Sequence, residues 1–142
     1  MNIRILLISS IYFTFLSIFP VCAQDVQLLD VTINEAKGDV EIMLPNTFDW
    51  VPVPEEAGVT FSEGTQIRTG PRSSVSLVFA DSGVVLVDSL TYMTVEQFFR
   101  TDNVVTTRIN LVIGSIVNTL NDGTHFENDY KIITPSLTET LN

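Results

Sequence analysis

Apolar and polar residues alternate along much of this chain with the two-residue period of a β-strand. In Ser74–Phe79 every second residue is apolar, which is typical of a half-buried strand. Val84–Val87 is a wholly apolar run of the kind that is buried on both faces. Asp81-Ser82-Gly83 lies between them and supplies turn residues, so the pattern predicts two neighbouring strands joined by a turn. Thr65–Thr69, between two glycines, is a third strand candidate.

The remainder of the chain shows the same signals. Gln97–Arg100 fits either a strand or a single helical turn, and the prolines of Pro45–Gly58 predict an irregular loop, because proline donates nothing to a ladder. A last strand, containing Phe126, Tyr130 and Ile132, is expected to return from a hairpin turn at Asn121-Asp122-Gly123. Further strands are predicted at Val26–Asn34, Val40–Leu44, Thr91–Val95, Thr106–Ile113 and Ser115–Leu120.

Two glycines mark changes of direction. Gly38, in Lys37-Gly38-Asp39, suits a turn that requires positive φ. Gly114 interrupts an otherwise continuous β pattern, which indicates a bulge or a sharp bend between sheets. Because no segment has a convincing helical period, we predict an all-β fold, a compact stack of short strands arranged as a sandwich, a roll or a β-solenoid.

The first 23 residues have the composition of a signal peptide. One positive charge at Arg4 precedes the apolar run Ile5–Phe19, and Val21 and Ala23 are small residues at the −3 and −1 positions of a cleavage site before Gln24. The alternatives are an uncleaved membrane anchor and a lipoprotein modified at Cys22. The preferred interpretation is an exported protein, in the periplasm or outside the cell, whose association with a membrane would require an uncleaved signal.

Cleavage before Gln24 leaves 119 residues without cysteine, so stability is expected to come from packing rather than from disulfides. Of the 7 basic residues, 6 remain against all 17 acidic ones, which gives a formal charge of −11. This balance argues against nucleic acid as a partner, because a phosphate backbone requires a basic face. It also argues against docking on an anionic membrane leaflet.

The sequence offers little catalytic chemistry. His125 is the only histidine, and no serine stands in a nucleophile-elbow context. Glu55-Glu56 is interpreted as a solvated pair of carboxylates. Asp81, Asp88, Asp122 and Asp129 lack the spacing of a calcium loop. We therefore expect no enzymatic activity, no metal and no cofactor.

Two residue types point to recognition instead. Trp50 is interpreted either as a cap over the open edge of the core or as an exposed recognition residue, since tryptophan is frequent at binding hot spots. Arg68 and Arg72 flank Gly70-Pro71 and are expected to pair with neighbouring carboxylates. The alternative is that these two arginines bind a carboxylate of a partner, because the planar guanidinium group matches the geometry of a carboxylate.

A series of short motifs follows in order from Gly38 to Pro135. Gly38-Asp39-Val40-Glu41-Ile42 and Trp50-Val51-Pro52-Val53 precede a central run of I-R-T-G, S-x-V-x-L-x-F and A-D-S-G. Leu111–Val117 and Phe126…Ile133-Thr134-Pro135 follow it. In this order the motifs resemble the FecR domain, a bacterial envelope module. The resemblance rests most directly on Gly38, Trp50, Gly64, Arg68, Thr69, Gly70, Ser74, Phe79, Asp81, Gly83, Gly114, Thr134 and Pro135.

This resemblance implies a domain organisation and a class of function. It implies a FecR-like β domain at 38–135, with a solenoid-like stack of strands favoured. Together with the signal peptide at 1–23, this leaves a lead-in strand at 24–37 and a short tail at 136–142. FecR-type regulators relay signals to a sigma factor, but they carry segments that are not found in this sequence. The implied function is a non-catalytic binding or sensing module whose partner is an envelope protein or a polysaccharide.

The end of the sequence departs from the family pattern. After Thr134-Pro135 the family continues into an R-G-T-like strand, whereas S-L-T-E-T-L-N follows here. This departure has three explanations. The sheet has an exposed edge, a partner or a second copy in a homo-oligomer adds the last strand, or the chain is a truncated relative of a sigma-factor regulator. The second function considered is therefore that of a structural or assembly module that completes its sheet with another chain.

Overall fold

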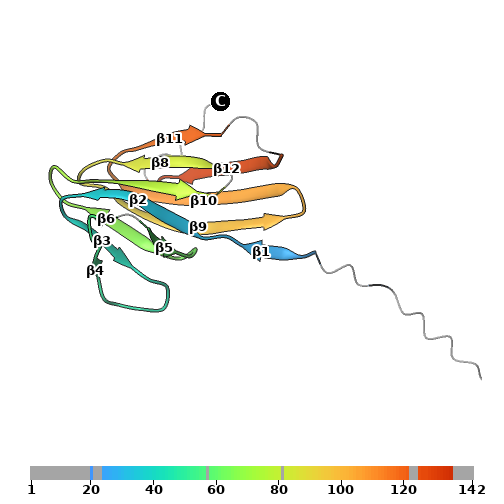
Figure 1. The fold of residues 1–142 in the computed structure, drawn as a ribbon, viewed down its shortest axis with the longest axis horizontal. Helices are drawn as coiled ribbons and strands as arrows, with labels where there is room; N and C mark the ends of the chain where they lie inside the picture. Colours follow the sequence, from blue (N-terminus) through green and yellow to red (C-terminus); the bar gives the residue numbers. More distant parts are fainter. Residues whose placement is uncertain (1–19, 21–23, 57, 81, 122–124, 136–142) are drawn as a thin grey trace, which may run out of the picture.

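A computed structural model describes residues 20, 24–56, 58–80, 82–121 and 125–135. In these residues it contains twelve β-strands in two sheets and no helix, which confirms the all-β prediction (Figure 1). Within the same residues no helix is long and apolar enough to cross a membrane.

The larger sheet, called sheet A, has the order β12-β10-β9-β6-β3-β4, and β1 pairs with one end of β9. Its pairs are antiparallel except for β10 and β12, which run parallel. Its strands are β1 (Val26–Leu28), β3 (Val40–Met43), β4 (Val51–Pro52), β6 (Gln66–Thr69), β9 (Tyr92–Thr101), β10 (Val104–Ile113) and β12 (Glu127–Ile133).

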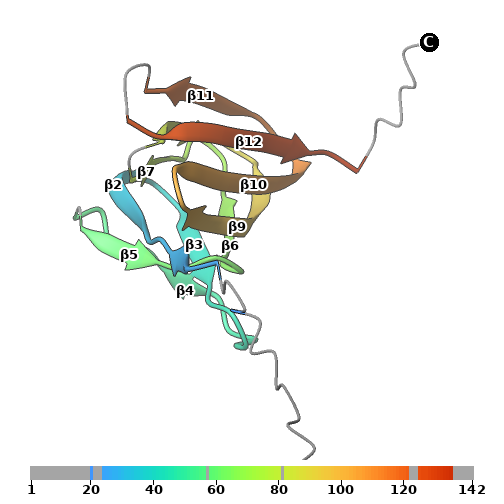
Figure 2. The same cartoon turned by 90° about the vertical axis from the view of Figure 1, so that its right-hand side faces the viewer.

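Sheet B has five strands in the order β11-β8-β7-β2-β5, all antiparallel. The two sheets surround one hydrophobic core, and Figure 2 shows the strands from a second side. Of the arrangements that the strand pattern left open, two facing sheets, antiparallel except for the β10–β12 pair, correspond to a sandwich. The strands of sheet B are β2 (Val31–Lys37), β5 (Val59–Phe61), β7 (Ser74–Phe79), β8 (Gly83–Val87) and β11 (Ile116–Leu120).

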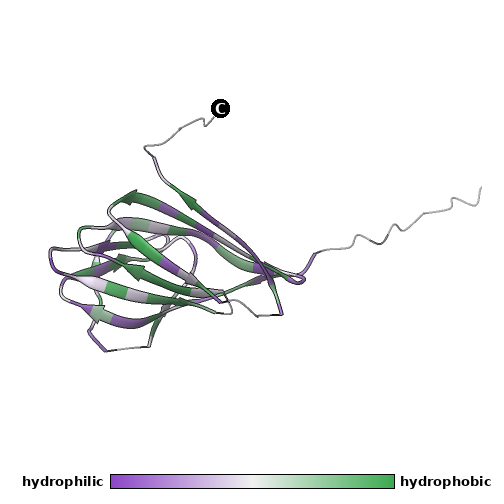
Figure 3. Ribbon diagram, turned by 90° about the horizontal axis from the view of Figure 1, so that it is seen from above, coloured by the Kyte–Doolittle hydropathy of each residue, from purple (hydrophilic) through white to green (hydrophobic). Residues whose placement is uncertain are grey.

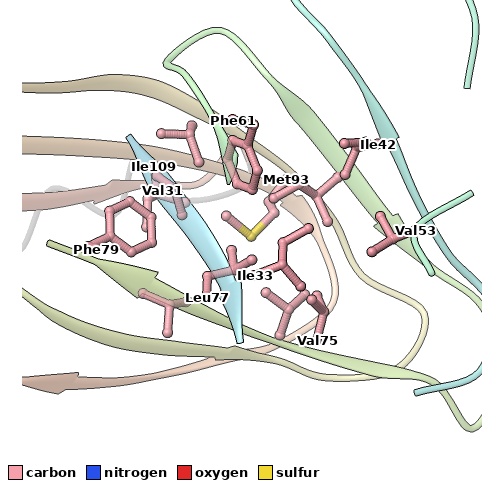
Figure 4. Close-up of a cluster of buried hydrophobic side chains, with 14 of the residues drawn as sticks. Val31, Ile33, Ile42, Val53, Phe61, Val75, Leu77, Phe79, Met93 and Ile109 are labelled. Atoms are coloured by element: carbon pink, nitrogen blue, oxygen red, sulfur yellow. The ribbon is translucent and has the colours of Figure 1, made fainter. Parts of the chain in front are cut away.

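The core is built by the inward residues of both sheets. Hydrophobic and hydrophilic residues alternate along the strands in Figure 3, and the inward set meets in Figure 4. Leu77 on β7 and Met93 on β9 are both fully buried from opposite sheets. Phe79 and Phe98 meet edge to face, with ring centroids 5.0 Å apart, a geometry that adds to the stabilisation from area burial.

Two ambiguous segments are resolved by their pairing. The strand predicted over Val26–Asn34 is interrupted at Leu29-Asp30, and β1 and β2 on either side join different sheets. Gln97–Arg100 is part of β9 rather than a helical turn. Glu96 is left unpaired there, because Arg108 lies opposite Gln97 and Ile109 lies opposite Val95. This β-bulge adds a residue to β9 and bends the strand.

Two expectations from the sequence are wrong. Val84–Val87 is not buried on both faces: Val85 and Val87 point inward, whereas Val84 and Leu86 are 37% and 46% exposed. No described element covers the outer face of sheet B at this point. The strands on either side of Asn121-Asp122-Gly123 do not form a hairpin either, because β11 pairs with β8 and β12 pairs with β10. Asp122 and Gly123 themselves lie outside the described residues.

Gly114 forms the bend between sheets that its position predicts. β10 before it belongs to sheet A and β11 after it belongs to sheet B. Its φ of 101° lies in the region that favours glycine. The chain can therefore change sheets within two residues.

Side chains bridge the gap between β11 and β12, which end the two sheets on the same side (Figure 2). The Tyr130 hydroxyl donates to Asn118 Oδ1, and the Ser82 hydroxyl donates to Asn128 Oδ1 at 3.0 Å. Burial raises the pKa of Tyr130 from its ordinary value of 10.0 to about 12. The folded protein therefore favours the neutral phenol.

This shift predicts a loss of stability at high pH. Because the pKa of Tyr130 is raised in the folded state, its contribution is complete below pH 10.0 and is lost as the pH rises toward about 12. Urea midpoints measured from about pH 9 to about pH 12 should fall less steeply in Tyr130→Phe than in the parent protein. Equal slopes for the parent and Tyr130→Phe would contradict this assignment.

Candidate interaction surface

Three polar or aromatic residues form one row across the outer face of sheet A. Glu41 on β3 lies opposite Arg68 on β6, which lies opposite Tyr92 on β9. Their sequence neighbours, such as Ile67 and Met93, are fully buried on the inner face. Because successive side chains of a strand point to opposite faces of the sheet, the three residues of the row point outward. Its three members come from strands that are far apart in the sequence.

Trp50 lies over this row and completes a cluster of interacting side chains. The Arg68 guanidinium carbon is 4.1 Å from the centroid of the Trp50 ring, and Arg68 Nε donates to Glu41 Oε2 at 2.6 Å. The Trp50 and Tyr92 rings meet at 71° with centroids 6.0 Å apart. The Tyr92 hydroxyl donates to Gln66 Oε1. We call Glu41, Trp50, Gln66, Arg68 and Tyr92 the Trp50 cluster.

The position of Trp50 follows from the edge strand after it. Val51 and Pro52 of β4 pair with Ile42 and Glu41 of β3, which brings the preceding residue over sheet A. Trp50 is half-buried there against Arg68 and Tyr92. It therefore does not cap the core, because it lies on the outer face of the sheet, away from the core cluster. It lies on the outer surface, as the alternative of an exposed recognition residue requires, but it is half-buried rather than exposed.

The surroundings of the Trp50 cluster are open and partly apolar. Phe48, in the loop before Trp50, is 94% exposed. A hollow of about 420 Å³ lies beside the cluster and shares Glu41 and Arg68 with it. The hollow is also lined by Gly38, Asp39, Val40, Pro52, Val53, Thr69 and Gly70. Exposed aromatic residues and hollows lined by both polar and apolar groups are features of binding surfaces.

Thr69 and Gly70, although they line this hollow, act mainly in the architecture of the corner behind it. Thr69 Oγ1 donates to the Asp88 carbonyl at 2.6 Å and accepts from the Thr91 backbone N–H at 3.0 Å. The buried Thr91 hydroxyl accepts from the Ser115 N–H at 3.1 Å. The Gly70 N–H donates to the Asp39 carbonyl at 2.9 Å. This network joins four turns at one end of the sandwich.

The other residues on which the FecR resemblance rests lie away from the Trp50 cluster, in turns, in strands or after the last strand. Gly38 has a φ of 73° in its turn, and a Cβ there would lie 2.5 Å from Ser73 Oγ. Ser74 and Phe79 are part of β7, and Gly83 begins β8. Thr134 and Pro135 are exposed after β12, Gly64 is exposed in a turn, and Asp81 lies outside the described residues.

The charged candidates have different environments. Arg68 pairs with a carboxylate, as predicted, whereas exposed Arg72 makes no ion pair within the described ranges and has a φ of 52°. Glu55, Glu56 and His125 are exposed. Asp88 Oδ1 accepts from the Ser89 N–H. The hydrogen bond from Arg108 lowers the pKa of Asp129 below its ordinary value. In the part of the chain that the structure describes, no three His, Cys, Asp or Glu residues gather as metal ligands.

Comparison with models of protein families finds no match for this chain, and comparisons with curated proteins and with solved structures find none either. The geometry of the surface is therefore the basis for a functional proposal.

Proposed function

We propose that this protein is an exported, non-catalytic binding module of the FecR type that recognises an envelope protein through the Trp50 cluster. The order of motifs from Gly38 to Pro135 supports the family, and the signal-like first 23 residues support export. The observation that carries the binding function is the packing of Trp50 against Arg68, which lies over its ring, and against the edge-to-face ring of Tyr92 at the surface of sheet A.

The composition of the cluster favours a protein partner. Tryptophan, tyrosine and arginine are the three residue types most enriched at the energetic centres of protein interfaces. The Arg68–Glu41 ion pair and the two aromatic contacts hold these side chains in place before a partner arrives. Preorganised side chains lose less conformational entropy on binding. A polysaccharide, which would stack on the same rings, is the second candidate ligand.

The partner can be captured by a cross-linker placed next to the cluster. Val51 is 49% exposed and follows Trp50 directly. With a photoreactive phenylalanine analogue at Val51, the purified protein should form one dominant adduct in an envelope extract of the source cells. The same analogue at exposed Thr60, on the edge strand of sheet B, is the matched control and should not form that adduct. Binding to cell-wall polysaccharide, measured by co-sedimentation, identifies the second candidate.

Trp50→Ala should weaken binding of the captured protein by at least about 30-fold, the effect of losing a hot spot of about 2 kcal/mol. Isothermal titration with the isolated partner measures this loss. Leu28→Ala, which truncates a 63% exposed residue on β1, should leave the affinity unchanged. Equal affinity of Trp50→Ala and the parent protein for every captured protein and for the polysaccharide would exclude the Trp50 cluster as the binding site.

A further inference from the structure

The free sheet edges of the described residues differ in how they are protected against pairing with another chain. An exposed edge strand presents unpaired N–H and C=O groups, and natural proteins protect such edges by short strands, proline or charge. β1 and β5 have three residues each, and β4 has two, one of them Pro52. β12 carries exposed Glu127, Asp129 and Lys131. Each of these edges is protected in one of these ways.

β11 is not short, carries no proline and carries no charge, and the contact described above on this side is the hydrogen bond from Tyr130 of β12 to the side chain of Asn118. The strand has five residues, Ile116–Leu120, and it pairs only with β8. β8 itself, Gly83–Val87, is also uncharged, in a protein whose formal net charge is −10. A strand of this kind at an edge is suited to accept another strand.

An apolar patch continues from this edge over the outer face of sheet B. Val117 is 58% exposed and lies opposite Leu86, which is 46% exposed. Val84, also exposed, lies opposite Thr119 in the same face. A strand added to β11 would place its own outward residues next to Val117 and Thr119. The edge and the patch therefore form one continuous surface without charge.

The sequence of β11 is chemically symmetric about its centre. Ile116-Val117-Asn118-Thr119-Leu120 has a branched aliphatic residue at each end, a β-branched residue at each second position and an amide in the middle. An antiparallel copy related by a two-fold axis at Asn118 places Ile116 opposite Leu120, Val117 opposite Thr119 and Asn118 opposite itself. A two-fold interface requires such self-complementarity. Pairs of β-branched residues across strands stabilise a sheet.

We propose that β11 is a dimerisation edge, at which two copies of this chain join their five-stranded sheets into one continuous antiparallel sheet. The partner is a second copy because the edge matches itself in its residues and presents no charge that would repel it. This inference is independent of the Trp50 cluster, which lies on the outer face of the other sheet. A different protein that adds its strand to the same edge is the alternative occupant, and the oligomeric state distinguishes the two.

Light scattering coupled to size exclusion tests the dimer. The full chain, expressed with its leader and purified after export, should have the mass of two copies at high concentration. Val117→Lys places a charge at the edge and should raise the dimer dissociation constant by more than about tenfold. Val51→Lys makes the same change at a 49% exposed position on an edge of sheet A and should not alter it. Circular dichroism confirms that both variants are folded.

Cysteine cross-linking tests the register without disturbing the fold by a charge. Across the two-fold axis, opposed Cα atoms lie about 4.5–5.5 Å apart, within the range for a disulfide. In a Cys22→Ser background, Asn118→Cys should therefore form a disulfide-linked dimer under mild oxidation, and Thr60→Cys should not. A monomer at all concentrations, a dimer unaffected by Val117→Lys, or no cross-link at position 118 would each overturn the proposal.

Discussion

Gly114→Ala is expected to destabilise the protein by more than about 3 kcal/mol, since two costs add. The φ of Gly114 is 101°, which costs a residue with a side chain about 1–2 kcal/mol. A Cβ would also lie 2.2 Å from Thr91 Oγ1 and 2.5 Å from Thr91 Cα, so the backbone at the corner must move. Urea unfolding followed by circular dichroism measures the loss.

Gly58→Ala separates the two costs. Gly58 has a similar φ of 105°, but a Cβ there meets nothing within 4 Å. Only the backbone cost of about 1–2 kcal/mol is therefore expected. Equal destabilisation by Gly58→Ala and Gly114→Ala would show that the close approach to Thr91 is unimportant.

Thr69→Val is expected to cost about 2–4 kcal/mol, because it removes two hydrogen bonds at a buried corner while the shape of the side chain is kept. Without the hydroxyl, the Asp88 carbonyl loses its donor and the Thr91 N–H loses its acceptor. Thermal and urea unfolding should both show the decrease in stability.

Thr69→Ser is the matched variant, because it retains the hydroxyl and removes only a methyl group. It should lose about 1 kcal/mol, near the value for a buried methylene. If Thr69→Val were as stable as Thr69→Ser, the hydroxyl would not hold the corner. The role of Thr69 would then have to lie in the adjacent hollow.

Local signals in the sequence predicted most of the strands and turns, but they missed β5 and also β4, which lies inside the predicted loop Pro45–Gly58. The alternation in Ser74–Phe79 and the glycine at position 114 predicted β7 and the bend between sheets, because both depend on properties of neighbouring residues. The number of buried faces of a strand is not a local property. Val84–Val87 carries apolar residues on both faces, although only Val85 and Val87 have a layer to pack against.

The features that the sequence did not predict, the partners of β11 and β12 and the full Trp50 cluster, depend on pairing between strands that are distant in the sequence. Asn121-Asp122-Gly123 has ideal hairpin residues, yet β11 and β12 find partners in different sheets. In the candidate site, Trp50 and Arg68 were recognised by residue type, whereas Glu41 and Tyr92 were not. The strand pattern places all three row residues at polar positions. Only the register of β3, β6 and β9 brings them together.

The pairing of β2 has a consequence for the rate of folding. β2 is flanked by β5 and β7, so the chain must close long loops before this part of sheet B can form. Folds dominated by such non-local contacts reach the native state in milliseconds to seconds rather than microseconds. A newly made chain therefore stays unfolded for milliseconds to seconds, an interval that the proposed export would use.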